Sequence, residues 1–458
     1  MPDLFGCLSM ATRALDAQRF GLDVVGQNIA NVNTPGYTRR VIDLASVPPT
    51  DSQSAGGGVT VLSVRSTRDQ MLAWRVREER PLEQREAAVA DGLSVIEVAL
   101  GHTGASVDAA LSAFFDSFSR LAEDPTSATA RQEVVMQGQS LANSFHDVAD
   151  RLESAQRDAD VRVRSIADQV NELASRIGRL NASMASAAAT GGDLALRDQI
   201  GNALEDLSKL VDIDVLDRAD GGADVSFANG RSLVVGANAY GISVRQTGST
   251  GSFSVFSQDA DVTSEISGGL LAGYLQVRDT IVPGYQAQLD TLAAAVVSQV
   301  NAVHAAGHDL DGTDAGDFFT PVVTTGAAAA MSVSPAIAAS PRRVAAAGIP
   351  VVGDNATARA IANLRDARVL GGGLSTFGDA WAQLVYRVGL DTSTARQEQE
   401  NRSDILTQIE AIRDGVSGVS LDEEAMMMMK YQRAFEANAR YFQSVSLALD
   451  TLLQMMSN

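Results

Sequence analysis

Both ends of the chain carry apolar residues that recur every three or four positions. The first run covers residues 3–32, and its repeating positions are Leu4, Leu8, Ala11, Leu15, Gln18, Leu22, Val25 and Ile29. In the last expected helix, 419–457, they are Met428, Tyr431, Phe435, Asn438, Phe442, Val445, Leu449, Leu452 and Met456. A mean period of about 3.5 residues is typical of a coiled-coil seam. We therefore predict that the first and last helices pair, with the middle of the chain inserted between them.

The middle of the chain is mostly helical in pattern. Pro35 should end the first helix, and residues 41–64 are expected to be extended. Helix resumes near residue 67, with a kink or restart expected at Pro81. Beyond the break at Pro125, one helix is predicted over about 127–186. At about 1.5 Å per residue it would be a rod of about 90 Å, far longer than a compact domain needs.

A short region in the second half alternates apolar and polar residues. Residues 211–266 do so between Gly, Asn and Asp turns, which predicts one small antiparallel sheet of four or five strands. Helix is expected again over 267–306, and then over 355–368 and 375–415. The Gly-, Ala-, Pro- and Asp-rich residues 307–354 are expected to be irregular.

These elements predict a mainly α fold with a small β insertion. The expected domains are a terminal coiled coil (1–40 plus 417–458), a long-helix domain (41–210 plus 267–416), a small antiparallel β subdomain (211–266) and a short irregular insertion (320–354).

Composition narrows the class of protein. Apolar residues make up 45% of the chain but aromatic residues only 5%, which suits close helix packing. The net charge is −20, which argues against nucleic acid as a partner because phosphate binding needs a basic face. Cys7 is the only cysteine, so an internal disulfide and a multi-cysteine metal site are excluded. We expect no cleavable secretory signal and no membrane span.

The chain offers little candidate chemistry. His304 and His308 could bind a metal with Asp309, Asp311 and Asp314, but Asp314 stands where a calcium loop needs Gly, so an Asp/Gly turn is the favoured interpretation. We therefore predict no catalytic residue, no cofactor and no metal site, and a protein that is not an enzyme.

Three features near the ends of the chain have structural interpretations. Ser420 and Glu423 are expected to form a capping box, which gives the adjacent acids Glu423 and Glu424 a structural role. The run 426–429 of four methionines is either core or a soft surface for a partner, and Cys7 is expected to be a packed residue.

Two terminal motifs carry a resemblance to a known family. Asn28, Ala30, Asn31, Thr34, Pro35, Gly36 and Tyr37 form an element that resembles one shared by the axial proteins of the bacterial flagellum: the rod, hook and hook-associated proteins. The segment 417–424, followed by Tyr431-Gln432 and Ala434-Phe435, resembles the matching C-terminal signature. Segments of the middle resemble the hook-associated members: Asp124-Pro125, Ala130-Arg131-Gln132, 268–273, Arg278-Asp279 and 301–319.

The resemblance implies an extracellular, non-enzymatic subunit of the hook–filament junction. It would be exported unfolded by the flagellar type III apparatus, after a transient stay in the cytoplasm, and assembled as a helical layer at the distal end of the hook. Its implied partners are further copies of itself, the hook protein, the next junction protein (hook-associated protein 3), and an export chaperone. The two seams would serve assembly: Leu4, Leu8, Leu15, Leu22, Val25 and Ile29 at the N-terminus, and Met428, Tyr431, Phe435, Phe442, Val445, Leu449 and Leu452 at the C-terminus. The C-terminal seam would also bind the chaperone.

Three alternatives stay open at this point. A hook or distal-rod subunit belongs to the same class, although a mostly β middle would suit it better. A carboxylate enzyme would use the Asp-rich loop 309–317, but no acid–base pair can be named. A cytoplasmic coiled-coil scaffold would explain the seams without explaining the element at 28–37.

Overall fold

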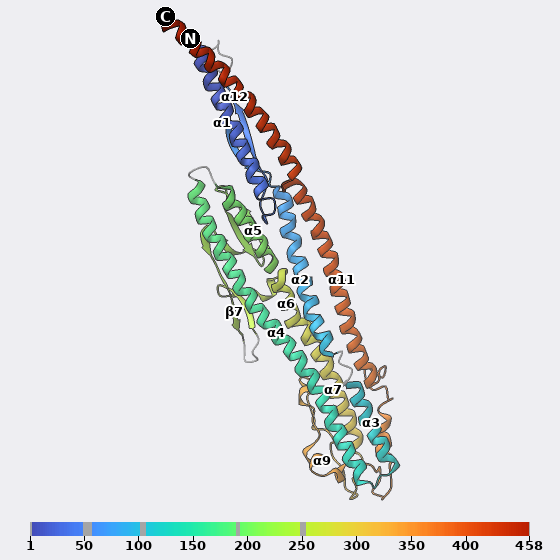
Figure 1. The fold of residues 1–458 in the computed structure, drawn as a ribbon. Helices are drawn as coiled ribbons and strands as arrows, with labels where there is room; N and C mark the ends of the chain where they lie inside the picture. Colours follow the sequence, from blue (N-terminus) through green and yellow to red (C-terminus); the bar gives the residue numbers. More distant parts are fainter. Residues whose placement is uncertain (1, 49–56, 101–106, 189–192, 248–252, 458) are drawn as a thin grey trace.

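The computed structural model describes residues 2–48, 57–100, 107–188, 193–247 and 253–457. The molecule is an elongated rod of helices with both chain ends at the same tip (Figure 1). The mainly helical fold class with small antiparallel sheets is confirmed.

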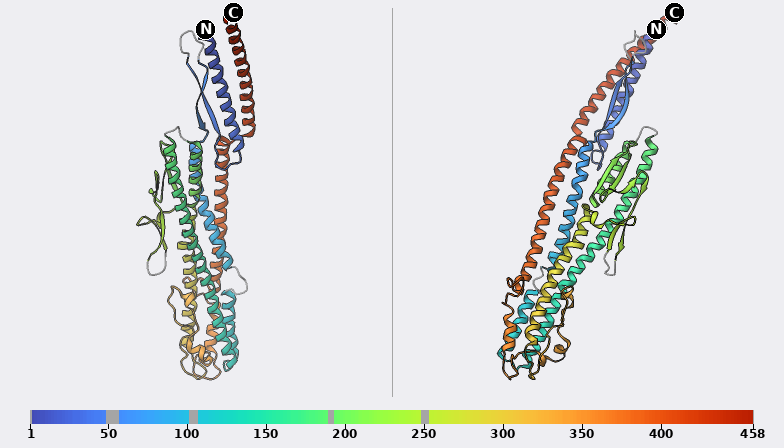
Figure 2. Two further views of the ribbon diagram at one scale, coloured as in Figure 1. Left: turned by 60° about the vertical axis from the view of Figure 1, so that its left-hand side comes forward. Right: turned by 180° about the vertical axis from the view of Figure 1, so that it is seen from behind.

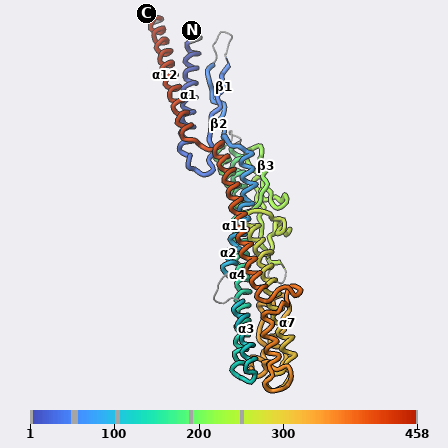
Figure 3. The backbone as a smooth tube through the Cα atoms, turned by 90° about the vertical axis from the view of Figure 1, so that its right-hand side faces the viewer, coloured from blue at the N-terminus to red at the C-terminus, as the bar shows by residue number. Residues whose placement is uncertain are grey.

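The tip of the rod is a helix pair with a hairpin beside it. α1 (Pro2–Ala30) and α12 (Leu421–Ser457) lie side by side and run in opposite directions (Figure 3). β1 (Arg40–Ser46) and β2 (Val59–Ser66) pair antiparallel and pack along α1. Of the extended stretch expected over 41–64, the described residues lie in or next to these two paired strands, and 49–56 lie outside the described residues. Below, the terminal pair means α1 and α12.

The body of the rod consists of long helices laid alongside one another (Figure 2). α2 (Gln70–Leu100) packs on α11 (Phe377–Ser417), and α3 (Val107–Glu123) packs on α4 (Ala128–Ala188). The remaining long elements are α5 (Leu194–Leu210), α6 (Gly269–Gln276), a π-helical turn (Val277–Ile281) and α7 (Val282–Ala305). The predicted rod-like helix is present: α4 has 61 residues.

Of the kink or restart expected at Pro81, the restart is wrong, because α2 continues through this residue as one helix. Pro81 is buried against α6, where a Cβ on Gly268 would lie 2.9 Å from the Pro81 Cβ. Glu79 and Arg80, directly before Pro81, are ion-paired to Arg402 and Glu410 of α11. Packing from both neighbours therefore keeps the two halves of α2 in one helix despite the missing N–H.

The β region forms two sheets, where the sequence predicted one. β3 (Ile213–Asp217), β4 (Ala223–Phe227), β5 (Arg231–Val235) and β6 (Asn238–Ala239) make a four-stranded antiparallel sheet. β7 (Ile242–Gln246), β8 (Phe253–Ser257) and β9 (Ala260–Asp261) make a separate three-stranded sheet.

Two asparagines on α4 hold the two sheets separately. The Asn181 amide bonds the N–H and C=O of Ala223, both within 3.0 Å, and the Asn171 amide bonds those of Ile242 at 2.8 Å. Each sheet is thereby fixed to the long helix by an amide that imitates a neighbouring strand. Periodicity along the strands themselves carries no sign of this division.

The segment expected to be an irregular insertion, 320–354, is built into the core at the far end of the rod. It contains α8 (Ala327–Ala330), α9 (Pro335–Ala339) and a 3-10 turn (Pro341–Arg343), and α10 (Ala356–Asn363) follows it. Small apolar side chains of this segment are buried, among them Ala328, Ile337 and Ala346. Beside them lies a cluster of buried rings with centroids 4.8–6.0 Å apart: Phe114, Phe115, Phe118, Phe318, Phe319 and Phe377.

Candidate functional site

The two terminal motifs meet where the terminal pair joins the body, and we call this contact the joint. At its centre the Asn28 amide is buried, with 1% of its surface exposed, and all four of its hydrogen-bonding positions are used. Its Nδ2 donates to the Arg40 carbonyl (2.8 Å) and to Glu424 Oε2 (3.0 Å). Its Oδ1 accepts from the Tyr37 hydroxyl (2.9 Å) and the Arg40 N–H (3.0 Å). A side chain this fully paired holds three chain segments in one geometry.

Glu424, at the start of α12, is the charged centre of the joint. It is also 1% exposed, and its Oε1 accepts from Arg39 Nε at 2.7 Å. The same guanidinium bonds Glu423 at 2.7 Å through Nη1. The predicted capping box is therefore wrong in one half: Ser420 Oγ accepts from the Glu423 N–H at 3.5 Å, but the Glu423 side chain is paired with Arg39.

The motif also connects to α5 of the body. The Thr38 hydroxyl donates to Asp198 Oδ1 at 2.8 Å, and Arg40 reaches Asp198 Oδ2 at 3.4 Å while covering the Tyr37 ring. Burial raises the pKa of Tyr37, so this phenol stays a neutral donor to Asn28. Gly36 has φ +71°, and a Cβ there would lie 1.6 Å from the side chain of Asn202, so glycine is required.

Ser417, the last residue of α11, closes the joint against the start of α2. Its carbonyl accepts from the Arg39 N–H at 3.1 Å, and its hydroxyl bonds Thr67 O at 3.3 Å and the Asp69 N–H at 3.2 Å. Asp69 in turn caps α2 by accepting from the N–H groups of Met71 and Leu72. The direction of the terminal pair is thus set by hydrogen bonds from four separate chain segments.

The other motif residues shape the turn after α1. Asn31 donates to Gln27 O at 2.9 Å and accepts from the Thr34 hydroxyl at 3.2 Å. Pro35 O accepts from Asn202 Nδ2 at 3.2 Å, and Ala30 is exposed. These residues lead the chain from α1 into the joint.

The seam residues of the terminal pair are only partly covered. On α1, Val25 is buried, whereas Leu4, Leu8, Leu15, Leu22 and Ile29 are half-buried. On α12, Val445 is buried, and Met428, Tyr431, Phe442 and Leu449 are half-buried. Phe435 and Leu452 are 37% and 42% exposed.

The outer side of the terminal pair carries further apolar groups. In the four-methionine run, Met427 and Met428 are half-buried and Met426 and Met429 are exposed. Leu447 and Met455 are 71% and 72% exposed. The terminal pair thus leaves apolar side chains in contact with solvent towards both ends of α12. We call these residues the uncovered strip: Met426, Met429, Leu447, Leu452 and Met455.

The known proteins to which this chain is similar are flagellar proteins. Residues 93–319 match the family described as flagellar hook-associated protein FlgK helical domain. Residues 8–38 match the flagella basal body rod protein family, and residues 415–455 the C-terminal family of the flagellar basal body rod FlgEFG proteins. Flagellar hook-associated protein 1 of Bacillus subtilis is 28% identical, with 100% of this chain and 99% of that protein aligned. That of Salmonella typhimurium is 24% identical over 98% of this chain and 99% of the relative. This chain belongs to the flagellar hook-associated protein 1 family.

A solved structure agrees with this assignment at the level of fold. The flagellar hook junction protein FlgK from Burkholderia pseudomallei superposes with a TM-score of 0.67 at 16% identity, covering 75% of this chain and all of that chain. The family resemblance predicted from the terminal motifs is confirmed, and the family is one of flagellar structural proteins. Of the helices in the described part of the chain, none combines the length and the apolar character that a membrane span requires.

The motif residues in the middle of the chain hold the body together. Buried Arg131 donates to the carbonyls of Pro125 and Val344. Buried Arg278 is bidentate to Asp279 (2.7 and 2.9 Å) and also bonds Asp160 at 2.9 Å. A Cβ on Gly269 or Gly273 would lie about 2.5 Å from the backbone of α5 or α2, so these glycines allow α6 to pack closely. Asn301 exchanges two 2.8 Å hydrogen bonds with Phe319.

The residues considered as metal ligands do not point towards a common site. His304 is fully buried: Nδ1 lies 2.7 Å from Gly316 O, and Nε2 accepts from the Ala345 N–H at 2.9 Å. His308 instead faces Asp314 at 3.5 Å, and Asp309 accepts from backbone N–H groups within its own turn. Among the residues that the structure describes, no three His, Cys, Asp or Glu side chains are placed to hold a metal ion. Asp311 pairs with Arg342.

Cys7 is half-buried on α1 and contacts the Tyr441 hydroxyl of α12, which raises the pKa of that tyrosine. This contact places Cys7 within the terminal pair.

Sequence reasoning missed several residues of the joint, among them Arg39, Arg40 and Asp198. Arg39 and Arg40 are adjacent cations directly after the motif in a strongly acidic chain, which is a signal that could have been read. Asp198 had no signal, because it lies 160 residues from its partner Thr38 and inside an ordinary amphipathic helix.

Proposed function

We propose that this protein is a structural subunit of the junction between the flagellar hook and filament, exported unfolded by the flagellar type III apparatus and assembled at the distal end of the hook. The observation that carries the proposal is the terminal pair: it is fixed to a folded body by the joint, yet much of its apolar surface is uncovered. Membership of the hook-associated protein 1 family supports the same role.

The uncovered strip gives a physical reason for assembly. A lone subunit leaves side chains such as Leu447 and Met455 in water, and packing against the terminal pairs of further copies would bury them. Burial of apolar area contributes about 25 cal/mol per Å², so a strip along a helix of 37 residues is a substantial driving force. Repeated contacts between unlike faces would then build a helical layer.

In this proposal the seam residues named from the sequence are the assembly residues. The hook protein would bind one face of the layer and the next junction protein, hook-associated protein 3, the other. Before export, a chaperone would bind the C-terminal seam and shield it, because an exposed apolar helix would otherwise aggregate. The body, with no proposed catalytic residue, metal or cofactor, would serve as a spacer on the outside.

The proposed domain division also follows from packing. A continuous apolar core runs from Ala88 to Ala395 through the body and includes the β region, but none of the terminal pair. The terminal coiled coil is therefore proposed as a unit separate from the body. The β subdomain (211–266) and residues 320–354 are proposed as subdivisions of a body in which they share one core with the long-helix domain. The long helix α4 disfavours the alternative of a hook or distal-rod subunit with a mostly β middle.

Labelled microscopy of isolated hook–basal bodies tests the proposal directly. Signal confined to the distal end of the hook is expected. Signal along the whole hook would instead support the hook-subunit alternative, and absence from the flagellum would contradict both.

A further inference from the structure

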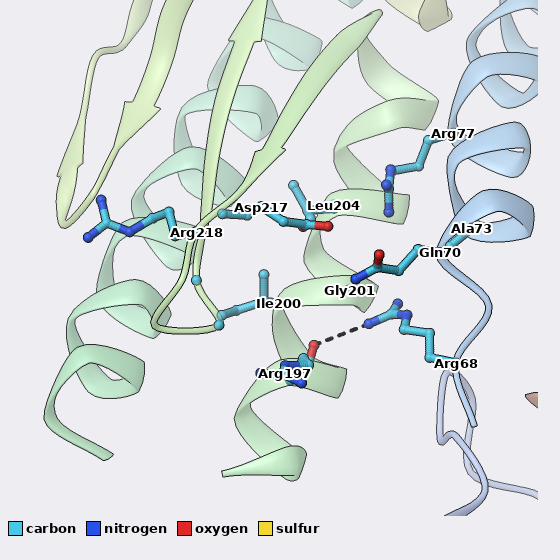
Figure 4. A pocket seen from close by; sticks show the side chains of 13 residues that line it. Arg68, Gln70, Ala73, Arg77, Arg197, Ile200, Gly201, Leu204, Asp217 and Arg218 are labelled. Atoms are coloured by element: carbon cyan, nitrogen blue, oxygen red, sulfur yellow. Dashed lines mark hydrogen bonds between the residues drawn. The ribbon is translucent and has the colours of Figure 1, made fainter. Parts of the chain in front are cut away.

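A pocket beside the joint is lined by four arginines. It lies between the start of α2, helix α5 and the turn from β3 to β4, and encloses about 150 Å³ (Figure 4). Arg68 and Arg77 come from the α2 side, Arg197 from α5, and Arg218 from the turn. Arg218 already has carboxylate partners, Asp220 and Asp224.

The charges of the other three arginines are only partly compensated. Among the described residues, Arg68, Arg77 and Arg197 form no ion pair with a carboxylate. Arg68 instead donates to the Arg197 carbonyl at 3.5 Å. Asp217, the one acid that lines the pocket, and Glu205 both attract the charge of Arg77, but neither forms an ion pair with it. Three cations and one anion leave the lining with a net positive charge.

The backbone of the pocket is shaped to admit these guanidinium groups. A Cβ on Gly201 would lie 2.1 Å from Arg68 Nη2, and one on Gly221 would lie 2.7 Å from Arg197 Nη2. Both guanidinium groups therefore occupy space that a side chain at Gly201 or Gly221 would fill. Arg77 is partly buried, and both its burial and the nearby charge of Arg68 lower its pKa, so an anion bound there would relieve a real electrostatic cost.

We propose that this pocket binds an oxyanion, and that in the assembled layer the oxyanion is a carboxylate side chain of a neighbouring copy of this chain. Planar guanidinium groups match the geometry of carboxylate and phosphate oxygens. The neighbour is the source because the chain has 56 acids against 36 bases, so adjoining copies bring surplus carboxylates together. Arginines free of internal partners offset that repulsion. The assignment of the source rests on the proposed function; the anion site does not.

One experiment examines the site in the free subunit. Thermal unfolding of the full chain is measured in inorganic phosphate and in sodium chloride at equal ionic strength. The site predicts that phosphate in the tens-of-millimolar range raises the melting temperature of the wild type by about 1–3 °C. The shift should vanish in the double variant Arg77→Gln/Arg197→Gln and in Gly201→Ala, whose methyl displaces Arg68. It should persist in Arg75→Gln, which removes an exposed cation from the same helix outside the pocket.

A second measurement identifies the source. The same variants are scored for retention on isolated hooks and for motility. Loss of retention by Arg77→Gln/Arg197→Gln, with the melting temperature in chloride unchanged and Arg75→Gln normal, supports a neighbour's carboxylate. A phosphate shift without any assembly defect supports a free anion and overturns the neighbour. If neither phosphate nor the pocket variants have an effect, or if Arg75→Gln behaves like them, the site is overturned. Wild type that does not bind hooks would contradict the proposed function and leave the phosphate result standing.

Discussion

The body and the terminal pair are built from similar amphipathic helices but are packed to different depths. In the body, six phenylalanines pack ring against ring out of solvent, and long apolar stripes on α4 are covered from end to end. In the terminal pair the fully buried apolar side chains are small or medium-sized: Ala11, Ala17, Val24, Val25 and Val445. The larger groups are half-buried or exposed. A helix pair with so little core is marginal in water by itself, and in the proposed assembly further copies would add to its stability.

The polar contacts differ in the same way. In the body, buried charges such as Arg278 and Asp160 are enclosed within one folded unit. In the joint, Asn28 and Glu424 connect segments 396 residues apart and fix how the terminal pair leaves the body. The terminal pair is therefore positioned by polar hydrogen bonds, and in the proposed function its exposed apolar side chains are covered by assembly.

The largest effect on stability is expected from opening the aromatic cluster. Phe318 is fully buried and its ring contacts those of Phe114, Phe319 and His304. Phe318→Ala should lower the free energy of unfolding by about 3–5 kcal/mol, from lost transfer energy plus a cavity. Urea denaturation followed by circular dichroism measures it, with Val323→Ala on the exposed surface as the control. A loss below about 1 kcal/mol would mean that the body is no better packed than the terminal pair.

The second-largest loss of stability is expected in the body at acidic pH. Burial lowers the pKa of His304 from 6.5 to about 4, so the folded state keeps this imidazole neutral while the unfolded chain protonates it. Stability is therefore fully present above pH 6.5 and is lost as the pH falls through that value toward 4, by a few kcal/mol at most. Comparing the pH dependence of unfolding in wild type and His304→Gln isolates this contribution. An identical slope between pH 6.5 and 4 in both proteins would show that His304 does not cause it.

The joint should give a smaller and more local effect. Glu424→Ala leaves Asn28 Nδ2 and Arg39 short of an acceptor, which costs on the order of 1–3 kcal/mol. Amide hydrogen exchange should rise in α1 and the first turns of α12 while α4 keeps its protection. Glu423→Ala removes only the outer, more exposed half of the ion pair and should change exchange little. Equal changes in the two variants would show that the buried carboxylate is not the anchor.

How much of the structure could be predicted from the sequence differs between these regions, for physical reasons. The seams and the 61-residue α4 follow from local periodicity, which helices report directly. The motif around Asn28 was recognised, but its partners were not, because hydrogen bonds between distant segments leave no periodic trace. Pro81 caused the opposite error. Proline tends to break a helix, but the packing of α2 against α6 and α11 keeps this helix continuous. The split of the β region depends on Asn171 and Asn181 of α4, which strand patterns do not record.

The smallest effect on stability is expected from a charge on the seam, and it sharpens the comparison most. Leu449 is half-buried on α12, whose C-terminal end lies at the tip of the rod (Figure 1). Leu449→Asp should leave the main melting transition of the body within about 1 °C, because the body core does not include this position. A carboxylate that becomes buried unpaired between copies costs on the order of several kcal/mol. The variant should therefore fail to build filament on the hook, whereas Gln443→Asp, which adds the same charge at an exposed position of α12, should be milder in a motility assay. Normal filaments in Leu449→Asp, or a large drop in the melting temperature of the body, would each contradict the view that α12 is completed by its neighbours.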